Sequence, residues 1–145
     1  MKLAALIQPT IHQQIRSLYQ AFLKLDEHKQ SVLMILAVVY KPIGIVKLGQ
    51  IIEILDNRGF LPQAKKEYRL SVQQKEQLSQ QSLLISNKEG VQLNPLLANR
   101  LTTEIDQLRT SFAFTSGQNL LEIIMAAEQI VPVVNSYSWQ NKDAD

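Results

Sequence analysis

Few side chains in this sequence are of the types that carry out catalysis or bind metals. The sequence has no cysteine and only two histidines, His12 and His28. His28 follows Asp26 by two positions, and residues at that spacing do not share a face of a helix. The carboxylates of Glu104 and Asp106 have the same spacing, and glycine-rich phosphate loops and serine-nucleophile motifs are absent from the sequence. We therefore expect no catalytic residue, no metal ligand and no cofactor, and a protein that is not an enzyme.

Basic and amide side chains are the more promising groups. The formal net charge is only +2, but five basic residues and one acidic residue lie between positions 58 and 75, and the segment after residue 100 is acidic. Lysine and arginine can neutralise phosphate groups. Next to this basic block lie Gln73, Gln74, Gln77 and Gln80, whose amides can read an adenine edge in a major groove. The alternative is that these residues form an ordinary solvated surface.

The composition favours a single, mostly helical domain. Five glycines and five prolines in 145 residues are few for a sheet-rich fold, and the hydrophobic fraction of 46% is typical of a globular protein. We expect one domain over residues 1–134 and a polar tail over 135–145 that would suit a linker to a longer protein. The longest apolar run is nine residues, whereas a membrane helix needs about 20. We therefore expect a cytoplasmic protein without a membrane partner.

Apolar periodicity predicts two helices before the basic block. Apolar residues at helical spacing predict an amphipathic helix over residues 11–25. The stretch from Val32 to Tyr40 is apolar on all sides, so its helix should lie at the centre of the core, with Asp26 as its cap and Pro42 beyond its end.

Two more helices should border the basic block. One is expected over residues 45–55, closed by Gly59 in the left-handed conformation. After a polar connection, Ser71 and Gln74 form a capping box, which predicts a polar helix from about residue 72 to residue 81.

A short hairpin and two helices should follow. Two apolar runs around the turn Asn87–Gly90 predict a β-hairpin over residues 83–93. A helix should begin at Asn94 and Pro95 and continue to Leu108. A connection is expected over residues 110–118, with Phe112 and Phe114 packed onto the core. The last helix should begin at a capping box of Asn119 and Glu122 and run to Pro132.

The first and last helices have more apolar surface than a small core needs. They either pack on the chain's own core, the commoner outcome, or bury a second copy or the rest of a larger protein. In the second case the predicted interface residues are Ile123, Ile124, Ala127 and Ile130.

The order of three helices, a two-stranded hairpin and a further helix resembles the winged helix-turn-helix family over roughly residues 28–100. Residues 32–40 look like the first helix of that family, residues 45–55 like the second, residues 71–81 like its recognition helix and residues 87–90 like its wing tip. The resemblance implies a mainly α fold with a small two-stranded β-hairpin, in which a winged helix-turn-helix core is flanked by N- and C-terminal helices.

The resemblance also implies a function in binding duplex DNA, as a transcriptional regulator or as the DNA-targeting N-terminal module of a larger bacterial protein. An alternative is a winged helix that serves protein assembly through its apolar terminal helices, as a homodimer or docked on the rest of a larger protein. The predicted DNA-binding residues are Arg58, Lys65, Lys66 and Arg69 for phosphates, Gln73, Gln74 and Gln77 for the groove, and Lys88 for the flanking backbone.

Overall fold

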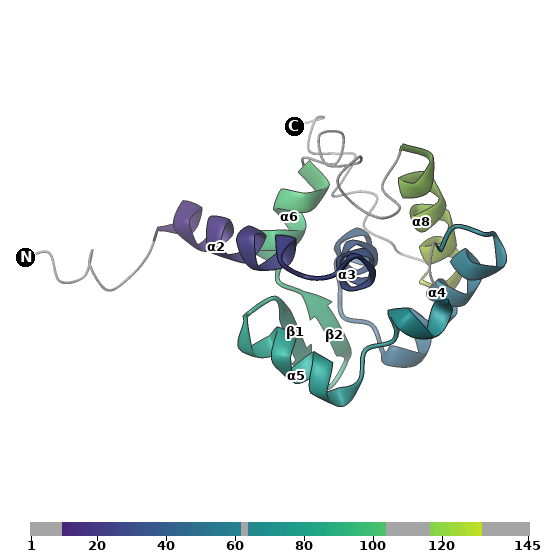
Figure 1. The fold of residues 1–145 in the computed structure, drawn as a ribbon, viewed down its shortest axis with the longest axis horizontal. Coiled ribbons are helices and arrows are strands. Elements are labelled where there is room, and N and C mark those ends of the chain that lie inside the picture. Colours follow the sequence, from purple (N-terminus) through teal and green to yellow (C-terminus); the bar gives the residue numbers. More distant parts are fainter. Residues whose placement is uncertain (1–9, 62–63, 104–116, 132–145) are drawn as a thin grey trace, which may run out of the picture.

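Helices and one hairpin make up the described part of the chain (Figure 1). The computed structural model describes residues 10–61, 64–103 and 117–131. Within these ranges the fold is mainly α with one two-stranded antiparallel hairpin, as expected, and the element order is compatible with a winged helix. The elements are α2 (Ile11–Leu23), α3 (Glu27–Val39), α4 (Ile45–Asn57), the 3₁₀ helix η1 (Lys65–Tyr68), α5 (Val72–Gln80), β1 (Leu84–Asn87), β2 (Gly90–Leu93), α6 (Pro95–Thr103) and α8 (Gly117–Ile130).

The helix α3 is the centre of the core, as its apolar sequence predicts. Asp26 caps it by accepting a hydrogen bond from the backbone N–H of Lys29. Every residue from Gln30 to Val39 is buried, because α6, α8, β2 and η1 all pack against this helix. The helix ends at Tyr40, which adopts a left-handed φ of 62° and so turns the chain away before Pro42.

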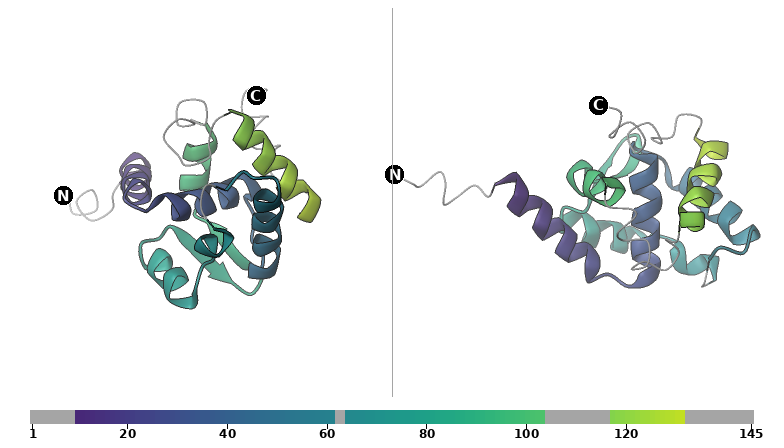
Figure 2. Two further views of the ribbon diagram at one scale, coloured as in Figure 1. Left: turned by 45° about the vertical axis from the view of Figure 1, so that its right-hand side comes forward. Right: turned by 90° about the horizontal axis from the view of Figure 1, so that it is seen from above.

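The helices α2 and α8 lie on opposite sides of α3 (Figure 2). The apolar stripe of α2 buries Leu18 and Phe22, and this helix packs against α6. The guanidinium of Arg100 on α6 lies over the Tyr19 ring of α2, 4.2 Å from the ring centroid. On the other side, α8 packs against α3 and α4. The two flanking helices therefore cover different faces of the core.

The residues predicted as a partner surface on the last helix lie within the chain's own core. Ile123 and Ala127 are fully buried, Ile124 is 7% exposed, and Ile130 is half-buried against the same cluster. Among the described apolar side chains of α8, Met125 is the large one that is exposed. Of the two expected alternatives, α8 therefore follows the first and packs on the chain's own core. While α8 is docked there, these four residues are not available to a partner.

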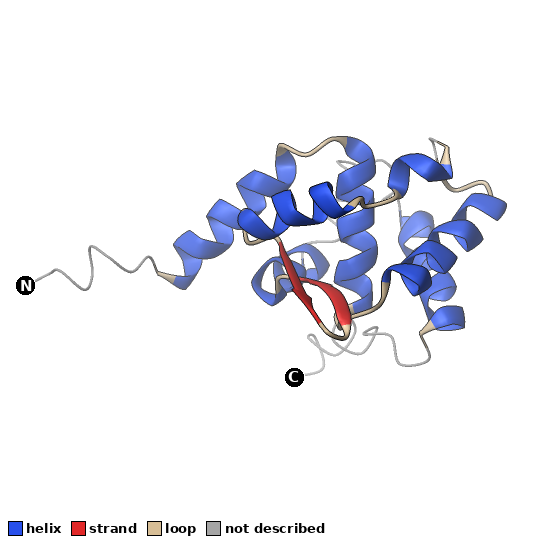
Figure 3. Cartoon of the chain, turned by 90° about the horizontal axis from the view of Figure 1, so that it is seen from below, coloured by secondary structure: helices blue, strands red, loops and turns tan. Residues whose placement is uncertain are grey.

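The helix α4 and the hairpin are joined through the segment between α3 and α4. Ile43 bridges Val91 of β2, with one backbone hydrogen bond in each direction, at 3.0 Å and 2.9 Å. The two strands of the hairpin lie side by side (Figure 3). They pair antiparallel, with Leu84 opposite Leu93 and Asn87 opposite Gly90. Gly90 has a φ of 132° and lies so close to the carbonyl of Ile43 that any Cβ would overlap it. The hairpin is therefore fixed to the start of α4.

The last helix and the stretch before α5 differ from the sequence expectations. The last helix begins at Gly117 rather than at a cap on Asn119, and the Glu122 carboxylate, expected in that capping box, binds Arg58 instead, at 2.7 Å. The stretch over residues 63–69, expected as a connection, contains η1 and the fully buried Tyr68. Gly59 has the predicted left-handed conformation, with a φ of 77°. Leu108, Phe112, Phe114 and the tail over residues 135–145 lie outside the described residues.

Candidate nucleic-acid interface

The helix α5 is held to the domain by a single buried side chain of its own. Its start is fixed by the predicted capping box, in which the Ser71 hydroxyl accepts from the Gln74 N–H at 3.1 Å and the Gln74 amide oxygen accepts from the Ser71 N–H at 2.9 Å. Leu78 is 1% exposed and is the one buried residue of α5. Just beyond the helix, the Leu83 N–H donates to the Leu78 carbonyl, and Leu83 is buried too. These contacts leave most of the α5 surface exposed to solvent.

The position of Leu78 determines which side chains face outward. Because a helix turns by about 100° per residue, the side opposite Leu78 has Gln73, Glu76 and Gln80, all three exposed. Of the three glutamines predicted to face the groove, Gln73 alone lies on this outward side. Gln80 is one of the four candidate amides but not one of the predicted DNA-binding residues, and Glu76 is in neither set. Because α5 contains two apolar residues, Val72 and Leu78, its sequence alone does not show which side is buried.

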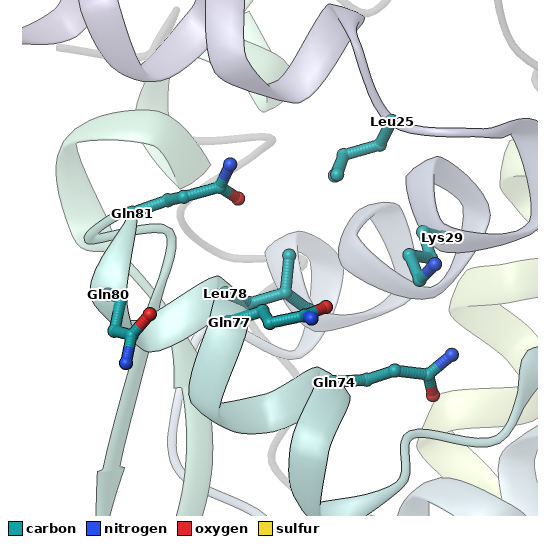
Figure 4. A pocket seen from close by; sticks show the side chains of 7 residues that line it. All are labelled: Leu25, Lys29, Gln74, Gln77, Leu78, Gln80 and Gln81. Atoms are coloured by element: carbon teal, nitrogen blue, oxygen red, sulfur yellow. The ribbon is translucent and has the colours of Figure 1, made fainter.

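The other two predicted glutamines border the seam between α5 and the core. Gln74 and Gln77 line a hollow of about 320 Å³ between α5 and the junction of α2 and α3, opposite Leu25 and Lys29 (Figure 4). Gln80 lines the same hollow, and Gln77 is exposed, so the hollow lies at the edge of the exposed side of α5. Gln74 is half-buried, and the helix cap occupies its amide oxygen.

The predicted phosphate-binding residues separate into two groups. Arg58, at the end of α4, donates to Glu122 of α8 at 2.7 Å, and Lys65 pairs with Glu53 at 3.7 Å. Lys66 and Arg69 are exposed and have no ion-pair partner within 4.0 Å among the described residues. The basic block is therefore partly neutralised within the domain, and its unpaired cations lie in η1 and just after it, next to α5.

Cations are also found on α5 and at the hairpin turn. Lys88 is exposed at the tip of the turn, where the Asn87 side chain accepts a hydrogen bond from the Glu89 N–H at 2.8 Å. Lys75, on α5, lines a hollow of about 410 Å³ between α5 and β1, together with Ser79 and Ser86. Neither lysine has an ion-pair partner in the described part of the chain. Together with Lys66 of η1 and Arg69 just after it, these lysines make four positive charges without an ion-pair partner among the described residues.

Apolar side chains are exposed near the same surface. Val46, on the first turn of α4, is 75% exposed, Val72, on the first turn of α5, is 71% exposed, and Ile45 is 40% exposed. Val46 and Ile45 line a hollow of about 290 Å³ between α4 and the segment that follows η1, with Tyr68 and Arg69 on the other wall. Neither Val46 nor Val72 was among the predicted binding or interface residues.

The two histidines offer little chemistry. His12 is exposed on α2. His28 is half-buried, with its ring edge-on to Tyr68 and its Nε2 3.5 Å from Asp26 Oδ2. The spacing argument against this contact was wrong, because Asp26 is the cap rather than a helical residue. No group of three or more histidine and carboxylate side chains is placed to hold a metal ion among the described residues.

None of the helices in the described ranges combines the length and the hydropathy needed to span a bilayer.

Comparison of the chain with models of protein families, with curated proteins and with solved structures found no match. The geometry of the α5 surface is therefore the basis on which a function can be assigned.

Proposed function

We propose that this protein is a cytoplasmic, non-enzymatic winged-helix domain that binds duplex DNA through α5 and the hairpin. The observation that supports this proposal is the outward side of α5, which presents the exposed amides of Gln73 and Gln80 between cations that lack a partner in the described chain. An exposed helix of this width fits a major groove, and amide side chains are suited to base edges.

In this arrangement the cations around α5 contact the DNA backbone. Lys66 and Arg69 lie before α5 in the chain, and Lys88 lies at the hairpin turn after it. We expect both groups, and Lys75 on α5, to contact phosphates. Four phosphate contacts give a slope of log Kobs against log salt of about −3.6. We therefore expect weak binding that depends strongly on salt, which suits a module within a larger DNA-binding protein or one half of a dimeric regulator.

The test is a fluorescence-anisotropy titration of a labelled 24-base-pair duplex at several salt concentrations. Replacing Lys66 and Arg69 together by alanine should weaken binding and reduce the magnitude of the salt slope by about 2. The matched control is Arg58→Ala, which also removes a cation, but one that is already bound to Glu122. If the double variant binds with unchanged affinity and slope, the proposal is wrong.

A second function, protein assembly, is favoured by the exposed apolar residues at the start of α4. Val46 and Ile45 border a hollow that a partner side chain can fill. The contact surface in this version is the α4 and η1 side rather than the terminal helices. Complete lack of duplex binding at 50 mM salt would leave assembly as the better proposal.

A further inference from the structure

The exposed surface of α5 includes one apolar side chain. Val72 lies on the first turn and is 71% exposed, although every other residue of α5 except the buried Leu78 is polar or charged. Val72 lies at the edge of the hollow between α5 and β1, next to Lys75 and Ser79. Packing within the domain therefore does not account for this valine.

The other outward side chains of α5 favour base edges over phosphates. Glu76 is exposed on the same helix, one turn after Val72, and its carboxylate repels the phosphate backbone. Gln73 follows Val72 directly and is exposed, with an amide that can donate to and accept from an adenine edge. A face with these groups is suited to the floor of the major groove.

The apolar group that the major groove offers is the C5-methyl group of thymine. We propose that α5 reads A·T base pairs, with Val72 in contact with a thymine methyl and the Gln73 amide bonded to adenine in the same or a neighbouring pair. This inference rests on the proposed function, because it names the class of DNA sequence that the same surface selects.

The methyl contact can be tested without knowledge of a natural site. The probes are three labelled 24-base-pair duplexes: alternating d(A-T), the same duplex with deoxyuridine in place of thymidine, and alternating d(G-C). Deoxyuridine keeps the base pairing and removes only the methyl group. The wild-type domain should bind the deoxyuridine duplex roughly fourfold more weakly than the d(A-T) duplex, as expected for loss of one buried methyl contact. The d(G-C) duplex should bind more weakly still.

Two valine variants locate the contact. Val72→Ala should bind the thymidine and deoxyuridine duplexes with equal affinity. Val46→Ala removes an equally exposed valine from α4 and should keep the wild-type difference. Both positions are open to solvent, so both variants should fold, which circular dichroism verifies.

The outcomes separate the inference from the function on which it rests. If the wild-type domain binds all three duplexes equally, or if Val72→Ala keeps the difference between thymidine and deoxyuridine, the A·T inference is wrong and DNA binding stands. If Val46→Ala loses the difference as well, the contact is not specific to Val72 and the inference is again overturned. If no duplex binds at 50 mM salt, the proposed function and the inference both fail.

Discussion

Replacement of Leu78 by alanine tests how α5 is attached to the domain. Leu78 is 1% exposed and is the one buried residue in this helix. The substitution removes three carbon atoms, whose transfer free energy is about 2.4 kcal/mol at about 0.8 kcal/mol each. The space they leave is not fully closed by relaxation, so we expect a total loss of about 3 kcal/mol in the free energy of unfolding. For a domain of this size the melting temperature should fall by about 10 °C.

Two measurements check this prediction. Urea unfolding followed by circular dichroism gives the change in the free energy of unfolding. Hydrogen exchange then reports where stability is lost, and amides of α5 should exchange faster relative to those of α3, which is surrounded by other elements. The matched control is Val72→Ala in the same helix, which is 71% exposed and should change stability by about 0.5 kcal/mol at most. A loss below about 1 kcal/mol for Leu78→Ala would refute the reasoning that Leu78 anchors α5.

Two further predictions concern backbone and capping contacts. Gly90→Ala should destabilise the domain by more than about 2 kcal/mol, because the new Cβ overlaps the Ile43 carbonyl and the φ of 132° is strained for any other residue; an unchanged urea midpoint would contradict the close approach of Gly90 to Ile43. Asp26→Ala should cost about 1 kcal/mol by removing the cap of α3, and Asp26→Asn should restore most of that loss; equal losses in the two variants would show that the cap hydrogen bond is not the source.

Local signals in the sequence predicted most of the elements correctly. The Asp26 cap, the Ser71 and Gln74 capping box and the all-apolar stretch of α3 each depend on neighbouring residues, and the structure has all three. Tyr68 was missed because it lies in a polar stretch without helical periodicity, and its burial comes from elements far away in the chain. Arg58 and Glu122 are 64 positions apart in the sequence. Local spacing therefore suggested instead that Arg58 binds phosphate and that Glu122 belongs to a helix cap.

The candidate site was predicted less completely for a similar reason. Residue chemistry selected three glutamines of α5, but which of them faces outward depends on where Leu78 packs. Gln74 belonged to two predictions at once, as a capping residue and as a groove-facing residue, and the cap is the role that the structure contains. The exposure of Val72 follows from the same packing, and no periodicity in a polar helix reveals it.

The bridge between Ile43 and Val91 has a consequence for how the protein folds. It joins the start of α4 to β2, so α4, η1, α5 and β1 all lie within one closed loop of the chain. The entropy of closing a loop grows slowly with its length, and it must be overcome before contacts distant in sequence add stability. Helix α5, with its own capping box, can form early, whereas the hairpin reaches its place beside α4 only when the loop closes. The position of η1, with its unpaired cation Lys66, relative to the hairpin is therefore set when this loop closes.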